Sequence, residues 1–241
     1  MTLLSIPTPT HGRVLVEDAA DSSRPRRGLI VAFHGYGQSA EDLLADVRSI
    51  PGAPAWTLVS VQGLHRFYAR DNRRVIASWM TRQDRELAIA DNVEYVKRVV
   101  EAVGGRLVED SGETADDPPG VLHRSTSDRL IFLGFSQGVA MAYRAALLGA
   151  HAPAGVVALA GDIPPELRAP GAGVRPWPPV FVATGARDTW FTPTRLADDV
   201  AFLESRGVSY ESLVFDGGHE WTDAFRAAAG RWLSSPAAGT M

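Results

Sequence analysis

The chain has 241 residues, of which 45% are hydrophobic and 22% charged, and its formal net charge is −4. This length suits one large α/β domain, and the mild acidity argues against nucleic-acid or anionic-membrane partners. The absence of cysteine excludes disulfides, thiol catalysis and thiolate metal sites, and it fits the cytoplasm, where we expect the protein to be. We expect no signal peptide in residues 1–10 and no integral membrane association, because no apolar run is long enough for a membrane span.

Strand and helix patterns alternate along the first half of the chain. In order, we expect an edge strand at 13–17, a strand at 28–34, a helix from Ser39 to about 48, a strand at 56–61 and a helix at 85–103. The run 28–34 is apolar throughout, which is typical of a strand buried on both faces. Residues 62–81 are expected to form a loop, and Gly104-Gly105 should end the second helix.

Residues 105–128 are acidic and show little periodicity, so we expect a surface excursion rather than a linker between domains. The alternation then resumes with strands at 130–133, 155–160, 179–184 and 210–215, and with helices from about 137, at 193–205 and at 220–233. The tail 234–241 should be loose. This alternation predicts a single domain over 1–241, with a mostly parallel central sheet and helices on both faces.

A serine lies where the strand 130–133 gives way to the next helix. The segment G-F-S-Q-G at 134–138 matches the pattern G-x-S-x-G, in which a tight turn projects the serine hydroxyl clear of the sheet. The N–H of Gln137 begins the helix, where it can stabilise negative charge on a reacting carbonyl. Ser136 is therefore the candidate nucleophile, with Gln137 as an oxyanion donor.

A nucleophilic serine needs a base, and the base needs an acid to orient it. In α/β enzymes with this turn, the acid and then the histidine follow the serine along the chain. Only His151 and His219 follow Ser136; His151 should close the Ser136 helix, whereas His219 follows a strand at the edge where such sheets place their sites. The acid is either Asp188 or Asp162, which both follow strands, and Asp162 also suits a cap or turn.

The loop after the strand 28–34 should supply the second oxyanion donor, for which we select the N–H of Tyr36. His34, in the same loop, precedes the serine and is expected to brace the loop by hydrogen bonding. Three aromatic residues flank the expected active-site loops and are candidates for substrate binding: Trp79, Trp190 and Phe191.

The segments H-G-Y-G at 34–37 and G-F-S-Q-G-V-A-M at 134–141, a Gly-x-x-Asp ending at Asp188 and a Gly-His ending at His219 resemble the phospholipase/carboxylesterase family. This is the acyl-protein-thioesterase-like branch of the α/β-hydrolases, and the resemblance runs from about 28 to 233. It implies the α/β-hydrolase fold and a serine esterase that needs no cofactor. It also places the acid one strand after L-A-G at 159–161, which favours Asp188 over Asp162. Val139, Arg187 and the long segment 105–128 depart from the family pattern.

We therefore expect a serine carboxylesterase that hydrolyses small-molecule carboxyl esters, or thioesters, through an acyl-enzyme. Short to medium acyl chains are favoured, because no stretch offers a sizeable hydrophobic lid. The alternatives are a lysophospholipase or acyl-thioesterase, a small peptidase or amidase with the same triad, and a catalytically silent binding protein. No metal or nucleotide site is indicated, and the sequence leaves the oligomeric state open.

Overall fold

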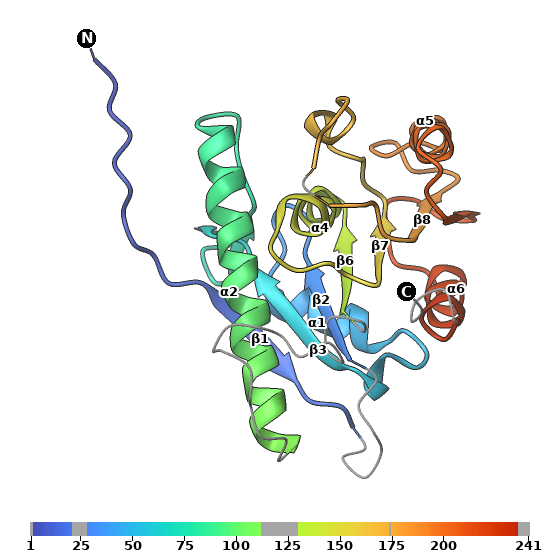
Figure 1. The fold of residues 1–241 in the computed structure, drawn as a ribbon, viewed down its shortest axis with the longest axis horizontal. Helices are drawn as coiled ribbons and strands as arrows, with labels where there is room; N and C mark the ends of the chain where they lie inside the picture. Colours follow the sequence, from blue (N-terminus) through green and yellow to red (C-terminus); the bar gives the residue numbers. More distant parts are fainter. Residues whose placement is uncertain (1, 21–27, 112–129, 174, 236–241) are drawn as a thin grey trace.

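A computed structural model describes residues 2–20, 28–111, 130–173 and 175–235 (Figure 1). Its centre is a seven-stranded sheet in which every neighbouring pair is parallel except β1 and β3. In spatial order the strands are β1 (Arg13–Glu17), β3 (Thr57–Gln62), β2 (Leu29–Phe33), β6 (Leu130–Phe135), β7 (Gly155–Leu159), β8 (Val180–Gly185) and β9 (Tyr210–Phe215). The prediction of a mostly parallel sheet, with 13–17 at its edge, is confirmed.

Helices cover both faces of the sheet, as predicted (Figure 1). One face carries α2 (Arg85–Ser111), α4 (Gln137–Leu148) and α5 (Pro193–Ser205), and the other carries α1 (Ala40–Arg48) and α6 (Asp223–Leu233). Side chains of β2 alternate between the two cores, since Val31 packs on the first face and Ile30 on the second. Burial on both faces explains why the central strands are apolar throughout.

Side-chain caps set the first residue of three helices. The Ser39 hydroxyl accepts the N–H of Asp42, and the Asp42 carboxylate accepts the N–H of Ser39, which forms a capping box at α1. Thr192 caps α5, which spans the range expected from the sequence. Thr222 caps α6, so this helix begins three residues later than predicted.

The prediction of a loop at 62–81 is wrong. This stretch holds the antiparallel hairpin of β4 (His65–Tyr68) and β5 (Val75–Ser78). All four residues of β4 are exposed, so the strand shows no alternation of apolar and polar residues.

The prediction that Gly104-Gly105 ends the second helix is also wrong, because α2 continues to Ser111. A glycine in a helix interior costs only about 1 kcal/mol relative to alanine, so Gly104 and Gly105 weaken α2 without ending it. Four valines before the glycines are buried: Val96, Val99, Val100 and Val103. Leu87, in the first turn of the same helix, is 51% exposed.

Several expectations fall on residues that are not described. The surface excursion expected at 105–128 begins inside α2, and its part from 112 onward lies outside the described residues, as does the tail from 236. Two short 3-10 helices, Ala53–Ala55 and Pro165–Leu167, complete the described elements. That the whole chain forms one domain stays a prediction.

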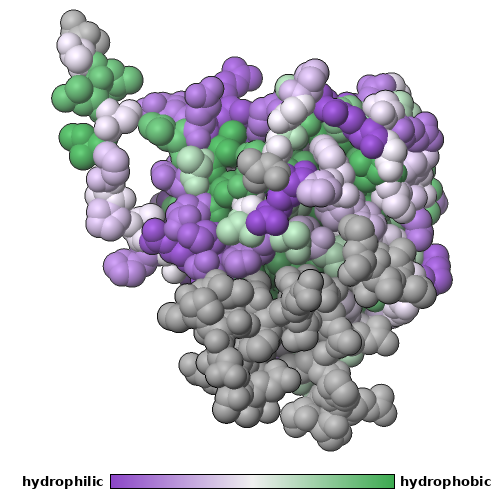
Figure 2. Space-filling view, in the orientation of Figure 1, coloured by the Kyte–Doolittle hydropathy of each residue, from purple (hydrophilic) through white to green (hydrophobic). Residues whose placement is uncertain are grey.

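The N-terminal segment before β1 runs away from the sheet (Figure 1) and stands clear of the body of the molecule in space-filling view (Figure 2). Its apolar side chains Leu3, Leu4 and Ile6 are exposed. Within the described residues, no helix combines the length and apolar character that crossing a membrane requires.

Candidate active site

Ser136 lies at the corner between β6 and α4, with a strained backbone. Its φ of 53° and ψ of −119° lie outside the conformations that residues with a side chain favour. The corner is also tight, because a Cβ on Gly134 would lie 2.5 Å from the carbonyl oxygen of Gly138. The Ser136 N–H donates to the carbonyl of Leu159 at the end of β7, at 2.9 Å. Neighbouring strands thus hold the serine in its unfavourable conformation.

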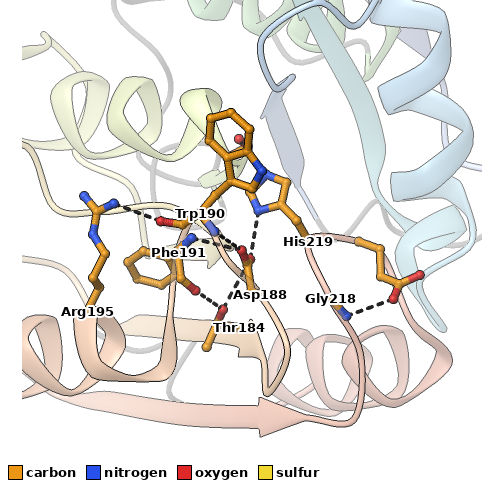
Figure 3. Close-up of polar contacts among 9 residues, drawn as sticks. Thr184, Asp188, Trp190, Phe191, Arg195, Gly218 and His219 are labelled. Atoms are coloured by element: carbon orange, nitrogen blue, oxygen red, sulfur yellow. Dashed lines mark hydrogen bonds and ion pairs between the residues drawn. The ribbon is translucent and has the colours of Figure 1, made fainter.

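His219 reaches this serine from the loop after β9. Its Nε2 lies 2.9 Å from the Ser136 hydroxyl oxygen. Its Nδ1 lies 2.8 Å from Oδ2 of Asp188, a contact drawn in Figure 3. The imidazole lies between two aromatic rings, with centroid distances of 5.1 Å to Phe135 and 6.5 Å to Trp190. The contact of Nδ1 with Asp188 turns Nε2 toward the serine hydroxyl, from which it can take a proton.

Asp188 lies in the loop after β8 with a fully buried carboxylate. Its Oδ1 accepts the N–H groups of Trp190 at 2.8 Å and Phe191 at 2.9 Å (Figure 3). The Thr184 hydroxyl donates its single proton to the Phe191 carbonyl at 2.5 Å. These bonds fix the carboxylate and leave Oδ2 directed at the imidazole. The neighbouring Arg187 turns away and pairs with Asp216.

The alternative acid, Asp162, does not contact His219. It forms an ion pair with Arg195 of α5 and lines the cavity beside Ser136. Its expected role as a cap or turn residue is not what the structure shows, because Arg195 projects back from the first turn of α5 to the end of β7. The structure therefore brings Ser136, His219 and Asp188 together and leaves Asp162 apart.

Two backbone N–H groups near Ser136 meet no acceptor in the part of the chain that the structure describes. In the loop after β2, the N–H groups of Gly35, Gly37 and Gln38 all donate hydrogen bonds, whereas that of Tyr36 meets no acceptor among the described residues. The N–H of Gln137 has none there either, as is usual for the first residue of a helix. Both groups are free to donate to a substrate oxygen.

The residues 16–189 match the family model described as Phospholipase/Carboxylesterase. The chain belongs to the phospholipase/carboxylesterase family. This membership indicates a hydrolase of esters and agrees with the resemblance drawn from the motifs around Ser136 and His219. A search of curated proteins finds none that matches.

Solved structures confirm the α/β-hydrolase fold of this family. The esterase PE8 is 21% identical, with a TM-score of 0.67, and the alignment covers 93% of this chain and 99% of that one. The Bacillus cereus carboxylesterase is 16% identical, with a TM-score of 0.61 and coverage of 92% and 93%. SOBER1 of Arabidopsis thaliana is 17% identical, with a TM-score of 0.63 and coverage of 86% and 97%.

In this phospholipase/carboxylesterase-family fold, a cavity of about 280 Å³ opens beside Ser136 and His219. Trp190 and Phe191 line it, as the sequence led us to expect for substrate-binding residues. The Trp190 ring is 76% exposed at the mouth, whereas the Phe191 ring is buried.

Trp79 does not line this cavity and is fully buried. Its indole N–H donates to the carbonyl of His34 at 2.8 Å, and its backbone N–H donates to the Gln137 side chain at 3.0 Å. Its expected contact with substrate is therefore wrong, because β5 directs the ring into the core. Trp79 instead links His34, at the end of β2, to Gln137, the first residue of α4.

His34 braces the loop that carries Tyr36. Its Nδ1 lies 2.7 Å from the Gly35 carbonyl, and its Nε2 accepts the N–H of Gly63 at 2.9 Å. Burial lowers the pKa of His34, which favours the neutral imidazole that this pair of contacts requires. His151, the other histidine that follows Ser136 in the chain, lies past the end of α4. Its Nε2 is 3.9 Å from Oε1 of Glu101.

Two parts of the site were missed in the sequence. The β4–β5 hairpin supports the loop that carries Tyr36, because the carbonyl of Ala77 accepts the N–H of Gly37 and the Ala77 N–H donates to the carbonyl of Gln38. Three arginines also line the cavity: Arg85, Arg144 and Arg195. A signal for one of them was present, since Arg144 is the only charged residue in α4 and stands eight residues after Ser136.

Proposed function

We propose that this family member is a serine carboxylesterase that cleaves small carboxyl esters through an acyl-enzyme. The observation that carries the proposal is the hydrogen-bonded series Ser136, His219 and Asp188, with donor–acceptor distances of 2.9 and 2.8 Å. A nucleophile, a base and an orienting acid in this order can activate a serine at neutral pH.

The reaction follows from the geometry. Ser136 attacks the ester carbonyl while His219 Nε2 takes the hydroxyl proton, and Asp188 stabilises the resulting imidazolium. The N–H groups of Tyr36 and Gln137 hold the oxyanion. His219 then gives its proton to the leaving alcohol and afterwards activates the water that releases the acid from Ser136.

The size of the cavity supports a short to medium acyl chain. Its volume of about 280 Å³ is at or below the lower end of the roughly 300–1,000 Å³ usual for ligand sites. Each added methylene should raise kcat/KM until the cavity is full, because each buried CH₂ contributes up to about 0.8 kcal/mol.

The first experiment labels the protein with a fluorophosphonate and locates the adduct by mass spectrometry. We expect the adduct on Ser136. Ser136→Ala should lower kcat by up to about 10⁶-fold, with residual catalysis from the oxyanion donors. Ser205→Ala is the matched control, because that hydroxyl only bonds its own helix. An adduct on another residue of active protein would refute the proposal.

The second experiment measures p-nitrophenyl esters from acetate to palmitate, with a thioester and an anilide of the preferred acid. We expect kcat/KM to peak before the long chains and the anilide to be the poorest substrate. A rate that still climbs at palmitate contradicts the small cavity. An anilide cleaved as fast as the ester would favour the peptidase alternative.

A further inference from the structure

Three arginines gather at the cavity beside Ser136. Glu166 takes two arginines, with Oε1 2.7 Å from Arg144 Nε and Oε2 3.0 Å from Arg85 Nη2. Asp162 pairs with Arg195. These three arginines, which all line the cavity, thus share two carboxylates, so this cluster of five side chains has a net charge of +1.

Arg144 is the unusual member of this group. Its side chain is only 3% exposed, although charged side chains are seldom buried without full pairing. Its Nε and Nη2 both approach Glu166, but among the described residues its Nη1 contacts only the thioether sulfur of Met80, at 3.7 Å. Sulfur is a weak acceptor, so Arg144 keeps unused hydrogen-bonding capacity. Burial lowers the pKa of Arg144, which marks the same shortage of compensating charge.

The cavity leads from the nucleophile to this arginine. Ser136, Ala140 and Arg144 follow one another at intervals of four residues, so they share one side of α4, and all three line the cavity. The Cα atoms of Ser136 and Arg144 are separated by about 12 Å at the helical rise, and the arginine side chain tilts back toward the start of the helix. An anion held by Arg144 would therefore lie only a few bonds from a carbonyl at Ser136.

We infer that this site prefers esters that carry a carboxylate a few bonds from the reacting carbonyl, bound by Arg144 and Arg85. This inference rests on the proposed esterase activity and specifies its substrate class. A carboxylate can accept two parallel N–H bonds from a guanidinium group, and it supplies the negative charge that the cavity lacks. The small volume limits the substrate to a short chain between the two groups.

The experiment compares pairs of esters that have the same shape and differ in charge. Mono-p-nitrophenyl glutarate is paired with p-nitrophenyl 5-methylhexanoate, in which an isopropyl end replaces the carboxylate. A second pair carries the charge on the alcohol: 4-(butanoyloxy)benzoate against 4-isopropylphenyl butanoate. Each kcat/KM is divided by the rate of hydroxide hydrolysis of the same ester. We expect the normalised ratio of charged to neutral ester to be about tenfold or more in one pair, since charge-assisted hydrogen bonds are the strong ones.

Variants of the arginines identify what binds the charge. Arg85→Gln and Arg144→Gln should each lower the ratio of charged to neutral ester about tenfold. Each leaves Glu166 with one arginine, so neither creates an unpaired carboxylate. Glu166→Gln should raise the ratio, because it removes a carboxylate that competes with the substrate. Arg98→Gln, on the same helix as Arg85 but 74% exposed and paired with Glu94, is the matched control and should leave the ratio within about twofold.

The outcomes separate this inference from the proposed function. If both neutral esters are hydrolysed and Ser136 is labelled, but neither charged ester is preferred, the inference is wrong and the esterase activity stands. A preference that survives both Arg85→Gln and Arg144→Gln also overturns the inference. If no ester is cleaved and Ser136 takes no label, the proposed function fails, and the inference fails with it. The Arg85 side chain is 39% exposed, against 3% for Arg144, so Arg85→Gln keeps the comparison decisive if an Arg144 variant does not fold.

Discussion

The two oxygens of Asp188 have separate partners, which gives this carboxylate a structural and a proposed catalytic role. Oδ1 holds the N–H groups of Trp190 and Phe191, and Oδ2 holds the imidazole of His219. Asp162, which follows the preceding strand β7, forms an ion pair with Arg195. The difference in partners predicts different consequences when each acid is replaced.

We expect Asp188→Asn to lower kcat by up to about 10⁴-fold on a good ester, because the amide stabilises the wrong tautomer of His219. Asp162→Asn should retain most of kcat, since this side chain does not contact the imidazole. Steady-state kinetics of both variants, with circular dichroism to verify folding, measure the difference. Loss of turnover in Asp162→Asn alone would mean that the acid has been assigned to the wrong strand.

At the scale of single residues, chain order and local motifs predicted which side chains contact one another in the structure. Ser136 has a local pattern, and only two histidines follow it. The choice between Asp162 and Asp188 needed the family resemblance, because both follow a strand. Trp79 was misplaced because the direction of its ring depends on the hairpin that precedes it, and no local pattern reveals that direction.

At the scale of elements, caps and burial determine how well the sequence predicts a boundary. The capping box at Ser39 and the cap at Thr192 are local, so the starts of α1 and α5 could be predicted. The hairpin β4–β5 has too little buried apolar surface to show a strand pattern. The two glycines at 104 and 105 weaken α2 without ending it, so a glycine pair alone is a poor guide to the last residue of a helix.

Substitutions at Gly105 and Gly207 test whether α2 continues as a regular helix through Gly105. A Cβ added at either would meet no atom within 4 Å, but Gly207 has a φ of +66° and Gly105 lies within α2. We expect Gly105→Ala to raise the free energy of unfolding by about 0.5–1 kcal/mol, because alanine favours the helix. Gly207→Ala should lower it by about 1–2 kcal/mol, because alanine disfavours left-handed backbone.

Urea denaturation of both glycine variants and the parent protein measures the two changes, with far-UV circular dichroism as the probe. The two sites share open surroundings, so the opposite signs isolate the backbone conformation. If Gly105→Ala destabilises the protein, α2 does not continue as a regular helix through this position.

At the scale of the whole molecule, the sheet assembles the site from distant segments. Ser136, Asp188 and His219 follow β6, β8 and β9, whose carboxyl ends lie along one edge. The alternation of strands and helices predicts a parallel sheet, but the spatial order of its strands depends on contacts between elements and could not be predicted from periodicity. The arginines around the cavity come from α2, α4 and α5, so their convergence is likewise a property of the complete fold.

Asp199 links two parts of this assembly. It lies on α5 and is almost fully buried, where its carboxylate accepts the N–H of Ile163 at 3.0 Å and pairs with Arg168. Ile163 directly follows Asp162, so this contact holds the segment that forms one wall of the cavity. Burial outweighs these partners and raises the pKa of Asp199 from 3.8 to about 6.

A raised pKa of Asp199 makes global stability depend on pH in a definite direction. The folded state binds the proton more tightly than the unfolded state, so ionisation of Asp199 costs stability as pH rises from about 4 to about 6. The shift of about two pKa units corresponds to a loss of folding stability on the order of 2–3 kcal/mol above pH 6.

The variant Asp199→Asn cannot ionise, yet it keeps an acceptor for the Ile163 N–H. Its stability relative to the parent should therefore improve by that amount between pH 4 and pH 7. Urea unfolding of parent and variant across this range gives the difference. A flat or opposite slope for Asp199→Asn would mean that Arg168 compensates the buried carboxylate fully and that its pKa is not raised.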